Sequence, residues 1–68
     1  METEMGNELL TPAEAAEILR ISPATLPRWR WAGEGPDFVR IGRSIRYRRE
    51  DLDRYIQRGA VRMSRGKN

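Results

Sequence analysis

The spacing of apolar residues changes along the chain, and it predicts helices toward both ends with two strands between them. Residues 12–19 and 50–58 carry apolar side chains three or four positions apart, which is the period of an amphipathic helix. The apolar side chains expected to face the core are Ala15, Ile18, Leu19, Leu52, Tyr55 and Ile56. Residues 38–41 and 45–48 alternate apolar and basic residues, which is the period of a half-buried strand.

Two helix starts lie close together near the N-terminus. Thr11 and Glu14, with proline between them, form the pattern of a capping box. Ser22, followed by another proline, repeats a start signal three residues after the first helix is expected to end. The second helix is expected to extend to Ala32, with Gly33 in the left-handed conformation that ends it. Two helices joined by so short a turn cross at a large angle, as in a helix-turn-helix.

The second helix contains a proline, Pro27, where a regular helix would not favour one. In an ideal helix capped by Ser22, the ring of Pro27 would crowd the carbonyl group of Pro23. We therefore expect a staged start, in which residues 23–25 form a loose or 3₁₀ turn and the regular helix begins near residue 26. Thr25 is then a candidate second cap.

The two strands are separated by Gly42, Arg43 and Ser44, which predicts a hairpin with a three-residue loop. The expected pairs across this hairpin are Ile41 with Ile45, Val39 with Tyr47 and Arg40 with Arg46. The four apolar residues would then share the buried face, and two arginines would lie opposite each other, which is unfavourable unless phosphates neutralise them. The alternative is a solvated edge whose cations prevent aggregation.

Charge is segregated along the chain. Five acidic residues and no basic ones precede Arg20, whereas 13 basic and five acidic residues stand from Arg20 onward. The first part therefore carries a formal charge of −5 and the second part +8, which gives the total of +3. All but one of the cations are arginine, whose guanidinium forks onto phosphates and base edges. This segregation favours a nucleic-acid partner over the alternative of a solvated, arginine-rich surface.

Several classes of function are disfavoured by what the chain lacks. It contains no cysteine and no histidine, so we expect no disulfide, no metal and no cofactor. No cluster of nucleophile and base is apparent in the sequence. The acidic residues near position 51 suit a helix start better than a metal site. We therefore expect that the protein is not an enzyme. No apolar run is long enough to span a membrane, and the first residues do not resemble a signal peptide, which favours the cytoplasm.

The second helix offers two faces with different roles. Leu26, Trp29 and Gly33 share one side by helical spacing, so Trp29 is interpreted as a core residue. The opposite side carries Ala24, Thr25, Arg28 and Trp31. The first half of such a helix enters the DNA major groove, where Arg28 can bond guanine and Thr25 can contact a phosphate or a thymine methyl group. Phosphate contact and simple solvation remain the alternatives for Arg28.

Three motifs occur in order along the chain: L-T-P-x-E-A-A-E-I-L, I-S-P-x-T-L-x-R-W and F-V-R-I-G-R-x-I-R-Y-x-x-x-D-L. They resemble the small winged helix-turn-helix family that includes phage excisionases and the DNA-binding domains of MerR-like regulators. The resemblance runs from Leu9 to Ile56 and implies an α+β fold: helix, turn, helix, two-stranded hairpin wing and helix. We accordingly expect a DNA-binding domain at 9–59, a flexible N-terminal tail at 1–8 and a basic tail at 60–68.

The resemblance also implies a way of binding double-stranded DNA, with the second helix in the major groove and the wing in the minor groove. By position it implicates Ser22, Ala24, Thr25, Arg28, Arg43 and Ser44. With the neighbouring basic and aromatic residues, the candidate DNA-binding residues are Ser22, Ala24, Thr25, Arg28, Arg30, Trp31, Arg40, Arg43, Ser44, Arg46 and Arg48. The sequence departs from the family pattern at Arg20, where glycine is usual, and at Pro27, where tyrosine or arginine is frequent.

Among proteins of this kind, the short chain resembles an excisionase more than a MerR-like regulator, which usually continues into an effector domain. The expectation is a recombination directionality factor in the cytoplasm of a bacterial host that bends attachment-site DNA. An integrase and further copies of the protein on DNA are the candidate protein partners. A small transcriptional regulator is the close alternative, and an adaptor that binds an acidic protein is a third.

Overall fold

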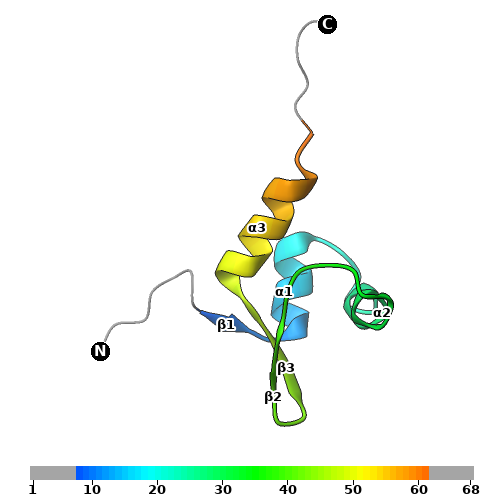
Figure 1. Cartoon of the computed structure of the whole chain (residues 1–68), viewed down its shortest axis with the longest axis vertical. Helices are drawn as coiled ribbons and strands as arrows, with labels where there is room; N and C mark the ends of the chain where they lie inside the picture. The colour runs from blue at the N-terminus through cyan, green and yellow to red at the C-terminus, as the bar shows by residue number, and fades with distance from the viewer. Residues whose placement is uncertain (1–7, 62–68) are drawn as a thin grey trace, which may run out of the picture.

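The computed structural model describes residues 8–61, which form three helices and three short strands. In chain order these are β1 (Leu9–Leu10), α1 (Pro12–Leu19), α2 (Thr25–Ala32), β2 (Val39–Ile41), β3 (Ser44–Arg48) and α3 (Arg49–Gly59). The order of helix, turn, helix, hairpin and helix confirms the predicted α+β, winged helix-turn-helix fold (Figure 1). Apart from Glu8, Ala60 and Val61, the tails expected at 1–8 and 60–68 lie outside the described residues.

The N-terminus of α1 has the capping box that its sequence predicts. The Thr11 hydroxyl accepts a hydrogen bond from the Glu14 amide at 3.1 Å, and the Thr11 amide donates to the Glu14 carboxylate at 2.9 Å. Two amides that lack a partner within the helix are satisfied in this way. Ala15 and Ala16 are the fully buried residues of α1, while its larger apolar side chains are half-buried against the core.

The turn between α1 and α2 contains a non-glycine residue in the left-handed region. Arg20 has φ 60° and ψ 43°, and its amide donates to the Glu17 carbonyl group at 3.2 Å. The next amide, of Ile21, donates to the Ala16 carbonyl group at 3.0 Å, so both bonds close the end of α1. The residue thus takes the conformation that glycine would adopt more easily, at a cost of about 1 kcal/mol.

The start of α2 is staged, as Pro27 predicts. The amide of Thr25 donates to the Ser22 carbonyl group at 2.9 Å, and that of Leu26 donates to the Pro23 carbonyl group at 3.3 Å. These are three-residue, 3₁₀-type bonds that precede the regular helix. The expected second cap is wrong, because Ala24 is the residue that precedes the helix and no side chain caps it. The helix ends as predicted at Gly33, which has φ 75°.

The hairpin of β2 and β3, called the wing below, has a different register from the predicted one. The Cα partners are Val39 with Arg46, Arg40 with Ile45 and Ile41 with Ser44. The loop therefore has two residues, and Gly42 at its first position has φ 59°, as in a type II′ turn. A shift of one residue exchanges the faces of one strand relative to the other. The predicted shared apolar face is therefore wrong, and so is the predicted opposition of Arg40 and Arg46.

A third strand, β1, was not predicted by the sequence pattern. Leu9 pairs with Arg48 and Leu10 with Tyr47, which gives an antiparallel sheet in the order β1-β3-β2. The amide of Arg49 also donates to the Glu8 carbonyl group at 3.0 Å. The segment before α1 is thereby fixed to the base of the wing, which leaves β3 as the central strand.

The core lies where the helices meet the base of β3. Its buried side chains are Leu10, Ala15, Ala16, Leu26, Tyr47 and Leu52. Trp29 packs against this cluster, which confirms its interpretation as a core residue. In α3 only Leu52 of the predicted apolar stripe is fully buried, whereas Ile56 is 45% exposed and its predicted burial is wrong. No helix in the described part of the chain is long and apolar enough to cross a membrane.

Candidate nucleic-acid interface

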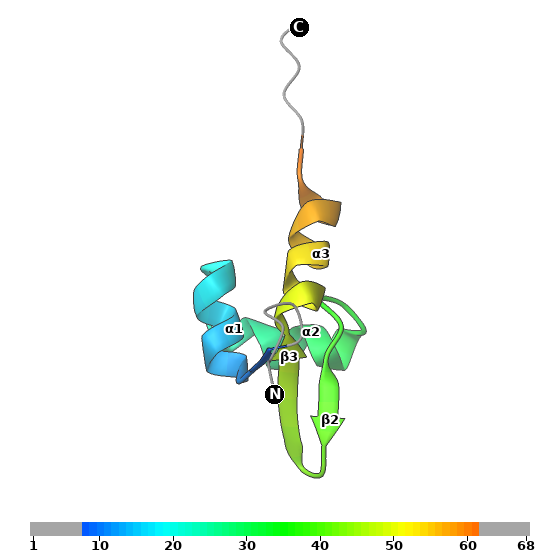
Figure 2. The ribbon, with the colours of Figure 1, turned by 90° about the vertical axis from the view of Figure 1, so that its left-hand side faces the viewer.

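The wing extends beyond the helices, while α2 lies beside its base (Figures 1 and 2). The hairpin turn is therefore the most outlying part of the sheet. Leu26 fixes α2 to the core with no exposed surface, and α1 is the element that α2 packs against most closely. The arrangement gives two separate projections from one small core, a helix and a hairpin.

The outer side of α2 and the turn before it carry the predicted helix contacts. Ser22, Ala24 and Arg28 are exposed, and Thr25 is half-buried. The Ser22 hydroxyl accepts a hydrogen bond from the Ala24 amide at 3.3 Å, which orders the turn that precedes the helix. Arg28 forms no ion pair with the acidic residues among positions 8–61. In the described part of the chain nothing thus occupies its guanidinium, which can bind a ligand.

Arg30 and Trp31 follow on α2 and differ in their surroundings. The Nη1 atom of Arg30 donates a hydrogen bond to the Tyr47 hydroxyl at 2.8 Å, and its guanidinium carbon lies 5.8 Å from the centroid of the Phe38 ring. Trp31 is 93% exposed. The structure thus turns Arg30 toward the protein and leaves the Trp31 indole in solvent.

The inner side of α2 is held in place by close packing around Trp29. Its ring lies 5.7 Å from that of Tyr55, at an interplanar angle of 53°. Gly35, with φ 86°, approaches so closely that a Cβ atom there would lie 2.7 Å from the Trp29 Cε3 atom. Any larger residue at this position would displace the indole, so the loop after α2 requires glycine for space as well as conformation.

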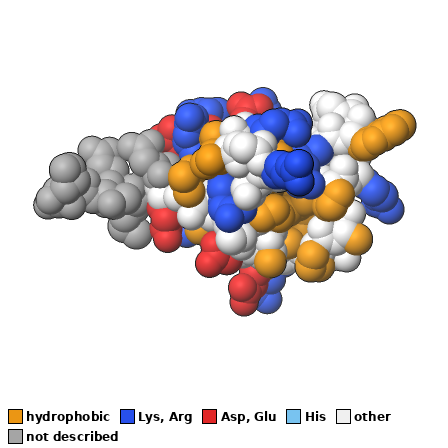
Figure 3. Space-filling model, turned by 90° about the horizontal axis from the view of Figure 1, so that it is seen from below, with side chains coloured by type: hydrophobic (Ala, Val, Ile, Leu, Met, Phe, Trp, Pro, Cys, Tyr) orange, Lys and Arg blue, Asp and Glu red, His pale blue; other side chains and the backbone are white. Residues whose placement is uncertain are grey.

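The wing presents most of its predicted residues to solvent. Arg40, Arg43 and Ser44 are exposed, and Arg43 is the second residue of the turn. Arg46 is half-buried and its Nη1 atom donates to the Ile45 carbonyl group at 2.7 Å. Figure 3 looks along the molecule from the wing end and shows basic side chains spread over this face, with apolar and acidic side chains also visible. The wing therefore offers exposed basic groups both on its strands and at its turn.

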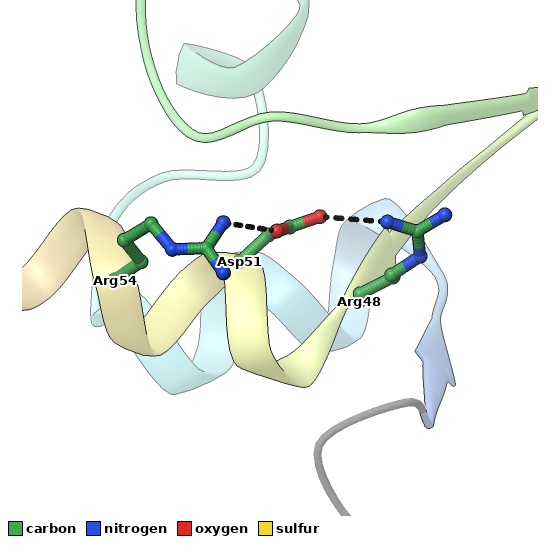
Figure 4. A network of polar contacts seen from close by, with 3 residues as sticks. All are labelled: Arg48, Asp51 and Arg54. Atoms are coloured by element: carbon green, nitrogen blue, oxygen red, sulfur yellow. Dashed lines mark hydrogen bonds and ion pairs between the residues drawn. The ribbon is translucent and has the colours of Figure 1, made fainter.

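Arg48 is different, because it belongs to a network around a buried aspartate. Asp51, at the start of α3, is only 5% exposed and lies between two arginines (Figure 4). Its carboxylate is 3.8 Å from Arg48 Nη1 and 3.0 Å from Arg54 Nη1. The sequence alone assigns the acidic residues near position 51 to a helix start, although the spacing of three residues from Asp51 to either arginine is that of helical ion pairs. The network links the end of β3 to α3.

No metal site accompanies this surface within residues 8–61, where no three His, Cys, Asp or Glu side chains are placed to hold an ion. The arrangement instead supplies guanidinium groups on a helix and on a hairpin turn. Such groups donate to phosphate oxygens and to acceptors on base edges. This surface can therefore bind a polyanion at two places, the helix α2 and the hairpin turn.

Comparison with known proteins agrees with this geometry. No curated protein matches the chain. A family model described as a helix-turn-helix domain matches residues 9–60, which include every described helix and strand. The chain therefore belongs to the helix-turn-helix family of DNA-binding domains.

Proposed function

We propose that the protein is an excisionase, which binds and bends attachment-site DNA so that an integrase favours excision. The observation that carries this proposal is a pair of exposed arginines that form no ion pair within residues 8–61, Arg28 on α2 and Arg43 at the wing turn. A helix and a wing that bind neighbouring grooves at the same time can hold DNA in a bent form. Smooth bending of a short site costs about 1 to 6 kcal/mol, which such contacts can offset.

In this proposal α2 reads the major groove. Arg28 donates two hydrogen bonds to one guanine, and Thr25 contacts a phosphate or a thymine methyl group. Ser22 and Ala24 lie at the turn before the helix, where main-chain and hydroxyl groups suit the DNA backbone. Trp31, at the other end of the exposed side, adds apolar contact with the DNA. Sequence preference would then depend mainly on Arg28.

The wing binds the adjacent minor groove and its phosphates. Arg43 enters or borders the groove, with Ser44 beside it, because the turn is the outermost part of the hairpin. By the observed register Arg40 lies on one face of the wing and Arg46 and Arg48 on the other, so they would contact the two phosphate backbones that border the groove. Arg48 would exchange part of its interaction with Asp51 for a phosphate, since the two groups are 3.8 Å apart at a half-exposed site.

The proposed organisation assigns DNA binding to residues 9–59. The basic segment at 60–68 would contact integrase, a neighbouring copy of the protein or further phosphates. Deleting residues 62–68 separates these roles. A loss of excision without a loss of DNA affinity would identify a protein contact, whereas a lower salt dependence of binding would identify phosphate contacts.

The proposal is tested by an excision assay with the cognate integrase and attachment sites on a supercoiled plasmid. We expect the protein to increase excision, to reduce integration and to bind a DNA site within one arm. Variants with Arg28→Ala and Arg43→Ala are expected to lose this stimulation together with DNA binding. If the protein occupies the site and represses a nearby promoter without affecting excision, it is a transcriptional regulator and the excisionase proposal fails.

A salt titration tests the DNA partner itself. The logarithm of the binding constant should fall by about 0.9 for each phosphate neutralised, per unit change in the logarithm of salt concentration. Absence of binding to any duplex selected from a random pool, even at low salt, would instead favour an adaptor that binds an acidic protein. Retention of a bound acidic protein by the Arg43→Ala variant would exclude the wing turn from such an interaction.

A further inference from the structure

Arg30 joins the two elements that are proposed to hold DNA. It lies in α2, and its Nη1 atom donates to the hydroxyl of Tyr47 in β3 at 2.8 Å. The same guanidinium lies over the ring of Phe38, 5.8 Å from its centroid, and Phe38 directly precedes β2. A single side chain thus connects α2 to the bases of both wing strands. These three residues are called the arginine bridge below.

The wing end of the arginine bridge is fixed in the core. Tyr47 is 1% exposed, its backbone pairs with Leu10 of β1, and its ring lies 6.1 Å from that of Phe38. Movement of the wing relative to α2 would therefore break a charge-assisted hydrogen bond and a cation–π contact together.

The backbone of α2 makes few close approaches to the wing strands. The helix packs most closely on α1, whereas the sheet packs on α1 and α3. The relative position of helix and wing therefore depends on side chains that reach between them. Arginine suits this position because its planar group can donate to one partner while its face covers an aromatic ring. A lysine ammonium cannot make both contacts in this way.

We propose that Arg30 is a positioning residue that sets the distance and angle between α2 and the wing, and that it does not itself contact DNA. This inference rests on the proposed binding of neighbouring grooves by these two elements. The bridge would determine the bend of the bound DNA, because a rigid connection makes the DNA adapt to the protein. A loose connection would let the wing follow straighter DNA.

The most selective variant is Tyr47→Phe, which removes one buried hydroxyl and changes no exposed surface. We expect the DNA bend, measured by energy transfer between the ends of a short duplex, to decrease, and affinity to fall about fivefold. Minor-groove protection at the wing should weaken more than major-groove protection at α2. Arg30→Met should have the same effects. The double variant should be no worse than either single one, because both remove the same interaction.

Two further measurements distinguish positioning from a direct phosphate contact. In the free protein, ¹⁵N relaxation at the Gly42 and Ser44 amides should show larger wing motion in both variants, with α2 unchanged. Arg30→Lys should keep the dependence on salt but not restore the bend, since it retains the charge without the bridge. Thermal unfolding of each variant provides the control for folding, and all binding is measured where each is fully folded.

The opposite pattern would overturn the proposal. In that case Tyr47→Phe would bind and bend DNA like the wild type, Arg30→Met would lower the salt slope by about 0.9, and Arg30→Lys would restore affinity. Stimulation of excision is measured separately. The excisionase role can therefore fail while the bend and the wing motion still decide the role of Arg30.

Discussion

The arginines at the beginning of α3 and those of α2 and the wing have different surroundings. Three arginines around the first two turns of α3 each lie within 4.0 Å of an aspartate oxygen, and they are Arg48, Arg49 and Arg54. Three exposed arginines of α2 and the wing form no such pair within residues 8–61, and they are Arg28, Arg40 and Arg43. The same residue type therefore stabilises the fold in one region and is available to a ligand in the other.

This difference shows why a count of cations overstates the charge that a DNA backbone would meet. An arginine beside an aspartate contributes little net field at the distance of a bound phosphate, whereas an unpaired one contributes its full charge. Arg48 lies between the two regions, because it ends a wing strand and yet is 3.8 Å from Asp51. The comparison predicts a stability role for one region and a binding role for the other.

The largest effect is expected from Asp51→Ala, which removes the acid shared by two arginines. Unfolding free energy should fall by about 2 to 3 kcal/mol, because a buried carboxylate with two charged partners is lost and a small cavity remains. Chemical denaturation measures the loss. DNA affinity of the folded variant should rise slightly, since Arg48 and Arg54 lose their acidic partner.

Asp53→Ala is the matched control, because its ion pair with Arg49 is exposed and contributes less than about 1 kcal/mol to the unfolding free energy. Equal losses from both variants would contradict the distinction.

The second effect is expected from Arg28→Ala, which removes the proposed base contact. Discrimination at one base pair should fall by about 2 kcal/mol, whereas unfolding free energy should change by less than about 0.5 kcal/mol. Binding to a set of sites with single substitutions measures the discrimination. Arg54→Ala is the control from the other region, and it should leave base preference intact. A uniform weakening across all sites would instead make Arg28 a phosphate contact.

A smaller effect is expected from Arg43→Ala at the wing turn. Affinity should fall by about 1 kcal/mol for every sequence, and the salt slope should become shallower by about 0.9 for each phosphate that the variant no longer neutralises. Titrations at several salt concentrations measure both. Arg49→Ala, which removes a paired arginine, should leave the slope unchanged. The division of roles between helix and wing would be wrong if Arg43→Ala changed preference at a single base pair only.

Helix boundaries could be predicted from the sequence because their signals are local. The hydroxyl of Thr11, the carboxylate of Glu14 and the left-handed conformation of Gly33 each act within one turn of backbone. The staged start of α2 was predictable for the same reason, since Pro27 excludes a regular turn before it. Fold class followed from the order of these elements, with little need for long-range information.

Features that depend on distant residues were not predictable. The observed two-residue loop at Gly42 and the predicted three-residue loop differ by one residue in the pairing of the strands. The alternating sequence pattern is compatible with both loops. The observed pairing is the one in which Tyr47 is buried in the core. Strand β1 is too short to show a period, and it is defined by pairing with Tyr47 far along the chain. In the candidate interface, the exposure of Arg28 and Arg43 was foreseen, but the partner of Arg30 was not, because it lies in another element.

The smallest effect tests whether lack of an acidic partner is sufficient for a role in DNA binding. Arg20 is exposed and forms no ion pair within residues 8–61, but it lines a hollow that also includes Glu8, Glu14 and Glu17. Its φ of 60° favours glycine, so Arg20→Gly should stabilise the fold by about 0.5 to 1 kcal/mol. Thermal unfolding measures this gain. DNA affinity should stay within about twofold of the wild type, because the acidic surroundings repel phosphates. A fall in DNA affinity as large as that of Arg43→Ala would show that the DNA-binding surface includes the turn between α1 and α2. An exposed arginine would then contribute to DNA binding even in acidic surroundings.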